Sequence, residues 1–394
     1  MIFLTPITPI NSLFPSLYII RQYSMVIFVL IIFLYCIVQK RFIQIGGNQI
    51  ILYIIAILIW SMIGIYNGYN AVAEASPLLM VLLTFIAVVI ASRNRMIKKE
   101  NVKHIAYALM ITWCGLYFFL AIGLLFGVIP IQWLMPIINV YMQANNSLTL
   151  TDGFLGILPR IGAGVNIVPL IIYGFFIYEN KKYDIVVWLL MFFYTVIDYG
   201  RVDIALFSVL TLLNMYRRLR QKNISNKIYS FLAIVLLVSI FFEGMAASNI
   251  SFDELYEGYT ARYDRPSDER TMQIKYINEY IENKTVMGYG LGAYTPEYTR
   301  SDNHWVYENQ FHAFVMQMGI VGFLMIIFNY LILFFRTVYR DMDKKYLMVV
   351  FICSSFWLLD CAVQGGLYHN DGRVICVIIY MLTRNEDNRI SEDK

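Results

Sequence analysis

Residues 26–38 read VIFVLIIFLYCIV, thirteen apolar side chains without interruption. Comparable runs recur along the chain, so that 59% of its 394 residues are apolar and only 15% are charged. An average soluble domain is about 45–50% apolar and about 25% charged. This composition excludes a soluble globular enzyme, a disordered regulator and a nucleic-acid-binding protein, and it indicates an all-α polytopic membrane protein.

The apolar runs predict about twelve transmembrane helices, because each span needs about 20 mostly apolar residues. The first is the weakest, since Pro6, Pro9 and Pro15 interrupt it and only a few residues around Arg21 connect it to the second. The spans are expected near residues 2–20, 24–38, 49–66, 77–92, 104–127, 163–178, 184–197, 202–216, 228–242, 310–335, 346–363 and 374–383.

The basic residues predict the orientation of these spans. Most of the 31 Lys and Arg residues fall in alternate loops, such as 93–103 and 336–345, and in the C-terminal tail. The positive-inside rule places these loops and both termini in the cytoplasm. The five cysteines form no disulfide or metal-binding pattern and are expected to pack as small apolar residues. We expect no removed signal peptide.

Two long loops then fall on the outer side of the membrane, near residues 128–162 and 243–309. Long loops of this kind are usually functional. The chain is therefore divided into an N-terminal transmembrane bundle, 1–242, which includes the first loop, a long extracytoplasmic loop, 243–309, and C-terminal transmembrane helices with a cytoplasmic tail, 310–394.

The longer loop contains an amphipathic pattern followed by a glycine motif. In residues 270–283, Ile274, Ile277 and Ile281 fall at helical spacing, with Arg270 one turn earlier on the same face. This predicts a helix lying on the membrane surface or on the bundle. Residues 287–294, MGYGLGAY, then carry three alternating glycines. Glycine permits close backbone approach, but the motif alone is weak, and no βαβ pattern supports dinucleotide binding.

Four arginines lie at the predicted outer edge of the membrane. A charge there is costly unless it is paired or used, and arginine suits bidentate recognition of phosphate oxygens. The competing interpretation for each is a local ion pair, such as Arg201 with Asp198 or Asp203. Taken together they favour an anionic substrate. They are Arg160, Arg201, Arg270 and Arg300.

Residues 304–319, HWVYENQFHAFVMQMG, carry a second group of polar side chains. If a helix starts early in this stretch, His304, Glu308 and His312 share one face. They could cap the helix where it leaves water, hold a metal ion, or accept the proton of a hydroxyl as a general base. A metal site is the least favoured interpretation because no further ligand is evident, and a catalytic or sugar-binding cluster is preferred.

The outer loop is also rich in aromatic residues. Interfacial belts of tyrosine and tryptophan explain part of this richness. The remainder favours a carbohydrate ligand, because a pyranose ring has apolar faces that suit an aromatic ring with a polar tip. The residues are Tyr256, Tyr259, Tyr263, Tyr289, Tyr294, Tyr298, Trp305 and Tyr307.

Together these motifs resemble the O-antigen polymerase/ligase superfamily. That superfamily shows an arginine, an amphipathic helix, a glycine motif, and then a stretch with asparagine and glycine that leads into a late transmembrane helix. Arg160 followed by Gly-x-Gly-x-Asn and the turn at Arg201 also resemble it. The other matching residues are Arg270, Gly288, Gly290, Gly292, Asn309, Phe311, Gln317, Gly319 and Gly322.

The stretch before the late helix departs from the ligase pattern. Ligases typically have a histidine immediately before the asparagine, where this chain has Glu308, and ENQF is similar to many Wzy-type polymerases. The usual glutamate before the late glycine is Gln317 here. These departures favour a polymerase. An O-antigen ligase is one alternative, and a lipid-linked oligosaccharide flippase is another, although no internal repeat is evident.

The resemblance implies a GT-C-like glycosyltransferase of the bacterial cytoplasmic (inner) membrane, with its active site facing the periplasm. It would join oligosaccharide repeat units carried on undecaprenyl pyrophosphate into O-antigen or a related surface polysaccharide. A chain-length regulator protein would be a further partner besides membrane lipid, and no cofactor or metal is expected.

The resemblance also implies roles for individual residues. Glu308 or His304 would act as the base toward the acceptor hydroxyl. Arg160, Arg201 and Arg270 would hold the pyrophosphate. The sugar would contact Arg300, Asn309, His312, Tyr289 and Tyr294.

Overall fold

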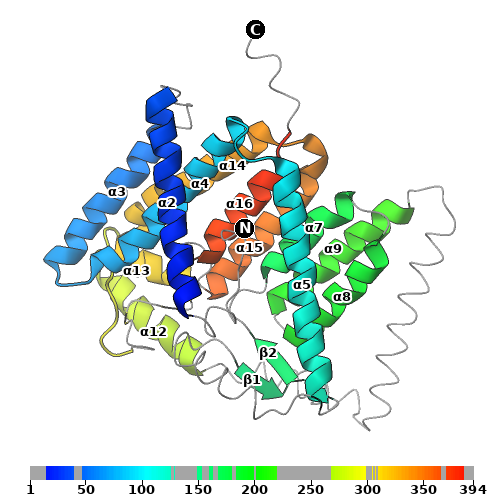
Figure 1. Ribbon diagram of the computed structural model, residues 1–394. Coiled ribbons are helices and arrows are strands. Elements are labelled where there is room, and N and C mark those ends of the chain that lie inside the picture. Colours follow the sequence, from blue (N-terminus) through cyan, green and yellow to red (C-terminus); the bar gives the residue numbers. More distant parts are fainter. Residues whose placement is uncertain are drawn as a thin grey trace. The chain divides into compact units, whose positions relative to one another are not determined.

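The computed structural model describes residues 15–39, 47–125, 128, 149–152, 159–162, 167–179, 183–198, 201–219, 268–298, 304, 307, 309–364 and 370–385. Within these ranges the helices are joined by turns and extended segments, and the strands form one short pair (Figure 1). Contacts divide it into two compact units, which we call unit 1 (residues 1–109 and 269–394) and unit 2 (residues 110–268). The three-part division by membrane side stays a prediction.

Helices from both ends of the chain build unit 1, so the blue and the orange-red ribbons of Figure 1 belong to the same unit. Each span that was predicted on described residues of this unit is a helix. The helices are α2 (Pro15–Gln39), α3 (Gly47–Tyr66), α4 (Ala71–Arg93), the first part of α5 (Lys99–Leu125), α12 (Asp268–Asn283), α13 (Gln310–Phe323), α14 (Asn329–Asp341), α15 (Leu347–Gln364) and α16 (Asn370–Thr383).

Among the described residues, four helical elements are long and apolar enough to cross a membrane: Gly47–Tyr66, Ala71–Arg93, Lys99–Phe119 and Gln310–Asp341. Shorter apolar helices are Tyr23–Gln39, Ile167–Glu179, Asp184–Thr195 and Gly372–Thr383. Such helices are what a helical membrane protein requires. The expected span 228–242 and most of the expected span 2–20 lie outside the described residues, and the count of twelve stays a prediction.

The prediction of a connection around Arg21 is wrong. A single helix, α2, runs from Pro15 to Gln39 and passes through this residue. Proline is tolerated at the first position of a helix, because the first backbone N–H groups have no intrahelical partner. The end of the expected 2–20 span therefore belongs to α2 and not to a separate helix.

α4 packs against α2, α3 and α16 within unit 1. Every residue from Phe85 to Arg93 is buried, because this helix is apolar on all of its faces rather than on one. The Phe85 ring lies 5.4 Å from the Phe334 ring of α14 and 5.9 Å from the Tyr380 ring of α16, measured between centroids. α4 is therefore the central helix of this unit.

A buried charged cluster joins the ends of α4, α14 and α16. Arg93 donates from Nε and Nη2 to the carboxylate of Asp341 at 2.9 and 3.1 Å, and the Tyr380 hydroxyl donates to the same carboxylate at 2.8 Å. Arg384 donates to the hydroxyl of Ser92. Because buried charge is stable only when it is paired and hydrogen-bonded, the charged cluster fixes these helix ends relative to one another.

α13 and α14 form one apolar element with two irregularities. Gly319 has φ 64° and ψ −179° and breaks α13, and a π-helical turn, Leu324–Phe328, precedes α14. Exposed apolar side chains such as Ile320 begin after the break. The break therefore separates a first part with buried and half-buried side chains from a second part with an exposed apolar face.

Unit 2 contains the rest of α5, the strands β1 (Thr149–Asp152) and β2 (Pro159–Gly162), and helices α7 (Ile167–Glu179), α8 (Asp184–Asp198) and α9 (Arg201–Leu219). The strands are antiparallel and lie in the stretch expected as a loop. α7 is buried from Ile167 to Ile177 and packs against α8 and α9. These three helices lie where spans were predicted at 163–178, 184–197 and 202–216, and their crossing of the membrane stays a prediction.

Candidate functional site

The glycine motif lies in an extended stretch, residues 285–293, which we call the glycine segment. On one side it is bound to the end of α3. The Leu291 N–H donates to the Trp60 carbonyl at 3.0 Å, and the Trp60 indole N–H donates back to the Met287 carbonyl at 2.7 Å. Asn67 adds a bond from its amide to the Tyr289 carbonyl, also at 2.7 Å.

On its other side the glycine segment fills the break in α13. Before Gly319, the carbonyls of Met316 and Gln317 accept from Tyr289 and Gly290 at 3.1 and 2.7 Å. After it, the N–H groups of Ile320 and Val321 donate to the carbonyls of Thr285 and Val286 at 2.9 and 3.2 Å. A helix interrupted here would leave these backbone groups without partners, so the glycine segment makes the break stable.

Two glycines show why this arrangement needs the motif. Gly290 has φ 99°, and a Cβ on it would collide with the backbone N and Cα of Gly64 in α3. A Cβ on Gly319 would collide with the Val286 carbonyl. Only glycine adopts such backbone angles at little cost and permits this approach. The expectation that the motif serves close backbone contact is confirmed.

α12 confirms the predicted amphipathic helix and packs beside the glycine segment. Ile277 is fully buried in a small apolar core with Tyr307, Ala313 and Met316. Gln273 lies one turn earlier on the same face and accepts from the Asn309 N–H at 3.2 Å. α12 therefore holds the start of α13 through both apolar and polar contacts.

Half-buried tyrosines gather around this core, and we call them the tyrosine surface: Tyr69, Tyr276, Tyr280, Tyr289, Tyr294 and Tyr298. Their rings meet in pairs. Tyr294 lies edge-on to Tyr69 at 5.8 Å, Tyr280 lies 5.2 Å from Tyr289, and Tyr276 stacks on Tyr298 at 6.3 Å. The exposed His304 lies edge-on to Tyr294, with 5.0 Å between the ring centroids.

Three tyrosine hydroxyls of this region, on Tyr69, Tyr280 and Tyr307, have a raised pKa. Burial raises the pKa of Tyr69, and Tyr289 and Tyr294 raise it further. Burial also raises the pKa of Tyr280, with Glu297 adding to the effect, and it raises the pKa of Tyr307 against the opposing hydrogen bonds from Thr295. The surface therefore offers apolar ring faces together with hydroxyl groups. A sugar has the same combination of apolar faces and hydroxyl groups, so the two suit each other.

The early helix start that would put His304, Glu308 and His312 on one face is not found. α13 begins at Gln310, with Asn309 at its N-cap position, so His304 lies in a turn outside the helix. His312, in the first turn, shares a 2.8 Å hydrogen bond with the side chain of Asn309. The helix starts late because Asn309 is held by Gln273 from α12. Glu308 itself lies outside the described residues.

The arginines predicted to bind phosphate are described only through their backbone. Arg160 pairs with Thr151 across the two strands, Arg201 is the first residue of α9, and Arg270 lies in the first turn of α12. Arg300 lies outside the described residues. Arg160 and Arg201 belong to unit 2 and Arg270 to unit 1. Phosphate binding and the competing ion pairs both stay predictions.

Several residues of this region were not anticipated from the sequence. Trp60 lies in the last part of α3, and Asn67 and Tyr69 lie just after it. The local sequence there contains no motif that indicates their contacts with residues far along the chain. Buried charges also occur in unit 1 at Glu74 and Arg373, which are 1% and 5% exposed. Their signal was available, because each lies within three residues of the start of an expected span, and a charge at a membrane edge is costly unless it is paired or used.

Comparisons of the chain with family models, with curated proteins and with solved structures found no match.

Proposed function

We propose that the chain polymerises oligosaccharide repeat units carried on undecaprenyl pyrophosphate at the outer face of the membrane. The observation that carries this proposal is the tyrosine surface beside the break in α13. Its rings match the apolar faces of pyranose sugars, and its hydroxyls match their rims. A lipid-linked glycan begins where the hydrocarbon ends, and the exposed apolar face of the α13–α14 element begins directly after the break.

In this reaction a bond forms between the anomeric carbon of the growing chain and a hydroxyl of the new repeat unit. The bond from that carbon to the lipid pyrophosphate breaks, and the hydroxyl proton passes to a base. Glu308 is the proposed base and His304 the alternative. His304 lies beside the tyrosine surface, which supports a role near the sugar. Arg160, Arg201 and Arg270 are proposed to stabilise the departing pyrophosphate.

The break in α13 also bears on the flippase alternative. Transporters use broken helices near the middle of the membrane, with the free helix ends pointing at the substrate. Here the first two N–H groups after the break, on Ile320 and Val321, already donate to the glycine segment. These N–H groups are therefore not free to point at a transported substrate, which favours an enzyme over a flippase.

A reconstituted assay tests the proposal. Purified protein in vesicles is given lipid-linked repeat units, and the products are separated by gel electrophoresis. A polymerase yields a ladder of products that differ by one repeat unit. A ligase yields no ladder and needs a separate lipid acceptor, whereas a flippase returns units of unchanged length. Either of these last two results would overturn the proposal.

Variants in the same assay test the assigned roles. Arg270→Ala should abolish the ladder and Arg270→Lys should restore it only in part, because lysine lacks the planar fork of arginine. Lys275→Ala, on an exposed position of the same helix, is the matched control. Glu308→Gln should abolish polymerisation more fully than His304→Ala. Normal ladders from Arg270→Ala and Glu308→Gln would remove both residues from the mechanism.

A further inference from the structure

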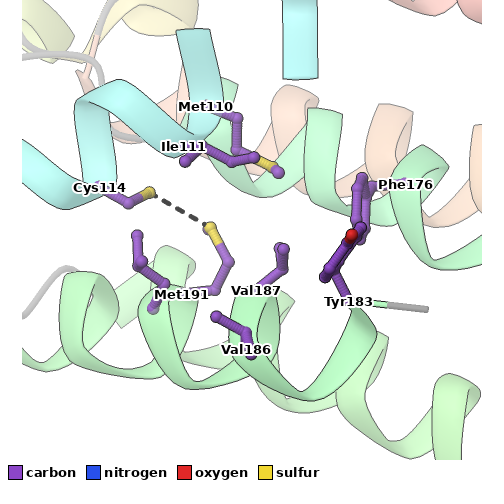
Figure 2. Close-up of a pocket in the computed structure, with 9 residues that line it drawn as sticks. Met110, Ile111, Cys114, Phe176, Tyr183, Val186, Val187 and Met191 are labelled. Atoms are coloured by element: carbon purple, nitrogen blue, oxygen red, sulfur yellow. Dashed lines mark hydrogen bonds between the residues drawn. The ribbon is translucent and has the colours of Figure 1, made fainter. Parts of the chain in front are cut away.

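Unit 2 contains a cavity of about 230 Å³, shown in Figure 2. Residues from α5 to α8 line it, and on its wall the Cys114 thiol contacts the Met191 sulfur at 3.3 Å. The wall is apolar throughout. An apolar wall takes up hydrocarbon but selects no particular molecule, whereas a charged surface of unit 1 does select its ligand.

In unit 1, the connection between α4 and α5 lies beside the connection between α14 and α15. The Arg93 guanidinium pairs with Asp341 at 2.9 Å, and the Lys99 ammonium lies 5.0 Å from the centroid of the Tyr346 ring. Both connections belong to the same compact unit. Their side chains therefore contribute to one surface.

The acidic side chains at this end of unit 1 are already paired. Within residues 92–104, 336–346 and 383–385, each aspartate and glutamate lies within ion-pair distance of a lysine or an arginine. The pairs are Arg93–Asp341, Arg340–Asp341, Lys345–Asp343 and Lys103–Glu100.

Four further basic side chains at this end are exposed, and none of them has an acidic partner within the same ranges. Two lie between α4 and α5, one lies toward the end of α14, and one lies in the short 3₁₀ turn that follows α14. Cations gathered at one place repel one another, so an anion that lies among them stabilises this end. We call these residues the basic surface: Arg95, Lys98, Arg336 and Lys344.

The exposed face of the α13–α14 element changes from apolar to basic as it reaches this surface. Phe328 and Ile332 are 55% and 36% exposed, and Arg336 follows at the same spacing of four residues, on the same face of the helix. The exposed Tyr339 comes one turn later. Apolar side chains followed by a cation and a tyrosine are typical of a helix that passes from hydrocarbon into the headgroup region.

α15 shows the same order from its own end. Directly after the 3₁₀ turn with Lys344, the helix exposes Leu347, Met348 and Phe351. Two neighbouring helices thus join exposed hydrocarbon contacts to unpaired cations. A soluble acidic protein would cover the cations and leave the apolar faces bare, whereas a phospholipid covers both with its headgroup and its chains.

We propose that the basic surface binds the headgroups of anionic phospholipids, whose acyl chains lie along the exposed faces of α14 and α15. Anionic headgroups are selected because a zwitterionic headgroup carries an ammonium group of its own, which the four cations repel. The bound lipid offsets the repulsion between these cations. This role depends neither on the polymerisation of glycans nor on the side of the membrane at which this end lies.

Photo-crosslinking in phosphatidylcholine vesicles tests the site. The purified full-length protein is reconstituted with a trace of phosphatidylglycerol that carries a diazirine in its acyl chain, or with the matching phosphatidylcholine probe. Labelled peptides are mapped by mass spectrometry. The anionic probe should label residues 328–332 and 347–351 in preference to the neutral probe, and salt at about 1 M should weaken this preference, because it screens exposed charges.

Two double variants with the same loss of charge provide the comparison. Arg336→Gln with Lys344→Gln should reduce the preference at least about fivefold, the effect of one basic residue near an anionic surface. Lys275→Gln with Lys284→Gln, at exposed positions on and just after α12, should leave it unchanged. Unfolding temperatures in detergent check that both double variants fold.

Three results would overturn the proposal. The first is equal labelling by the anionic and the neutral probe, and the second is an equal loss of preference in both double variants. The third is displacement of the probe by soluble polyglutamate, or by a polyprenyl phosphate, under conditions in which excess unlabelled phosphatidylglycerol does not displace it. That result would assign the basic surface to an acidic protein or to a different lipid.

Discussion

At one end of unit 1, Arg93 and Tyr380 donate to the buried carboxylate of Asp341. At the other end, the glycine segment binds α3 and α13 mainly through neutral backbone groups. Hydrogen bonds to charged groups are stronger one by one, whereas backbone bonds each contribute about 1 kcal/mol. The charged cluster therefore concentrates its stabilisation in a few atoms, and the glycine segment distributes it over a long contact.

The two ends therefore suit different roles, the charged cluster for stability and the glycine segment for holding the proposed binding surface. A buried ion pair cannot lose one partner without leaving a charge in an apolar place, so the charged cluster suits a permanent connection between helices. The glycine segment uses backbone groups for its attachment and leaves the side chains of Tyr289 and Tyr294 half-exposed. The glycine segment is thus held mainly through its backbone, and the tyrosine side chains of this end stay available to contact a ligand.

The largest effect is expected from Asp341→Ala. This change leaves the Arg93 guanidinium, 8% exposed, without its carboxylate, and it should destabilise the protein by about 3–5 kcal/mol. Thermal unfolding in detergent, followed by size-exclusion fluorescence, measures the loss. The matched control replaces both partners by apolar residues, Arg93→Met with Asp341→Leu, and should recover much of the stability. A melting temperature unchanged by Asp341→Ala would show that the charged cluster does not stabilise the contact between the ends of α4, α14 and α16.

Gly290→Ala should give the second largest effect, at the opposite end of the unit. The new Cβ meets the backbone of Gly64 at a φ of 99°, and the combined strain and overpacking should cost about 3 kcal/mol. Gly115→Ala is the control, because a Cβ there has nothing within 4 Å. The same unfolding experiment compares them. Equal stability of the two variants would mean that the glycine segment does not approach α3 so closely.

Trp60→Phe should show how the glycine segment distributes its stabilisation. It removes one side-chain bond, from the indole to the Met287 carbonyl, while the bond from Leu291 to the Trp60 carbonyl stays. The expected loss is about 1–2 kcal/mol. A loss as large as that of Asp341→Ala, in the same thermal assay, would mean that this end also depends on a single side chain.

The smallest effect concerns Asp343, beside the charged cluster but exposed to solvent. A hydrogen bond from Lys345 lowers the pKa of its carboxyl, and the Lys345 ammonium lies 2.9 Å away. Because the folded-state pKa lies below the unfolded one, the stabilisation is complete above about pH 4 and is lost as the pH falls through the folded value. After solvent screening it amounts to about 0.5 kcal/mol or less.

Asp343→Asn measures this contribution. The variant should fall slightly below the wild type near pH 7, and the gap between their unfolding temperatures should narrow as the pH falls below the unfolded-state pKa of about 4. A difference that grows toward low pH would contradict the assignment. If Asp343→Asn lowered the stability as much as Asp341→Ala, then the buried and the more exposed ion pair at this end would contribute equally, against this account.

Local patterns in the sequence predicted the pieces of the site better than their assembly. The spacing of Ile277 and Ile281 predicted α12, and the alternating glycines predicted close backbone contact, because both signals lie within a few neighbouring residues. The partners of the glycine segment are Trp60 and Gly64, far away in the chain. Nothing in the local pattern of α3 indicates that contact.

The start of α13 shows a second limit of the sequence. Hydrophobic spacing permits an earlier start, with His304 on the helix, but the Asn309 N–H is bound by Gln273 and the helix begins at Gln310. Arg93 shows a third limit, since its position beside a basic loop favoured a role in topology, whereas the structure buries it against Asp341. In each case a distant tertiary contact decided the outcome.

The most direct test of this account is the membrane side of the two ends. His304→Cys marks the tyrosine surface and Asp343→Cys marks the loop beside the charged cluster, while all five native cysteines are buried. Each variant is treated in spheroplasts with a maleimide that cannot cross the membrane, before and after lysis. The account predicts that His304→Cys is labelled before lysis and Asp343→Cys only afterwards. Labelling of His304→Cys only after lysis would place the tyrosine surface in the cytoplasm and contradict the proposed outer-face polymerase.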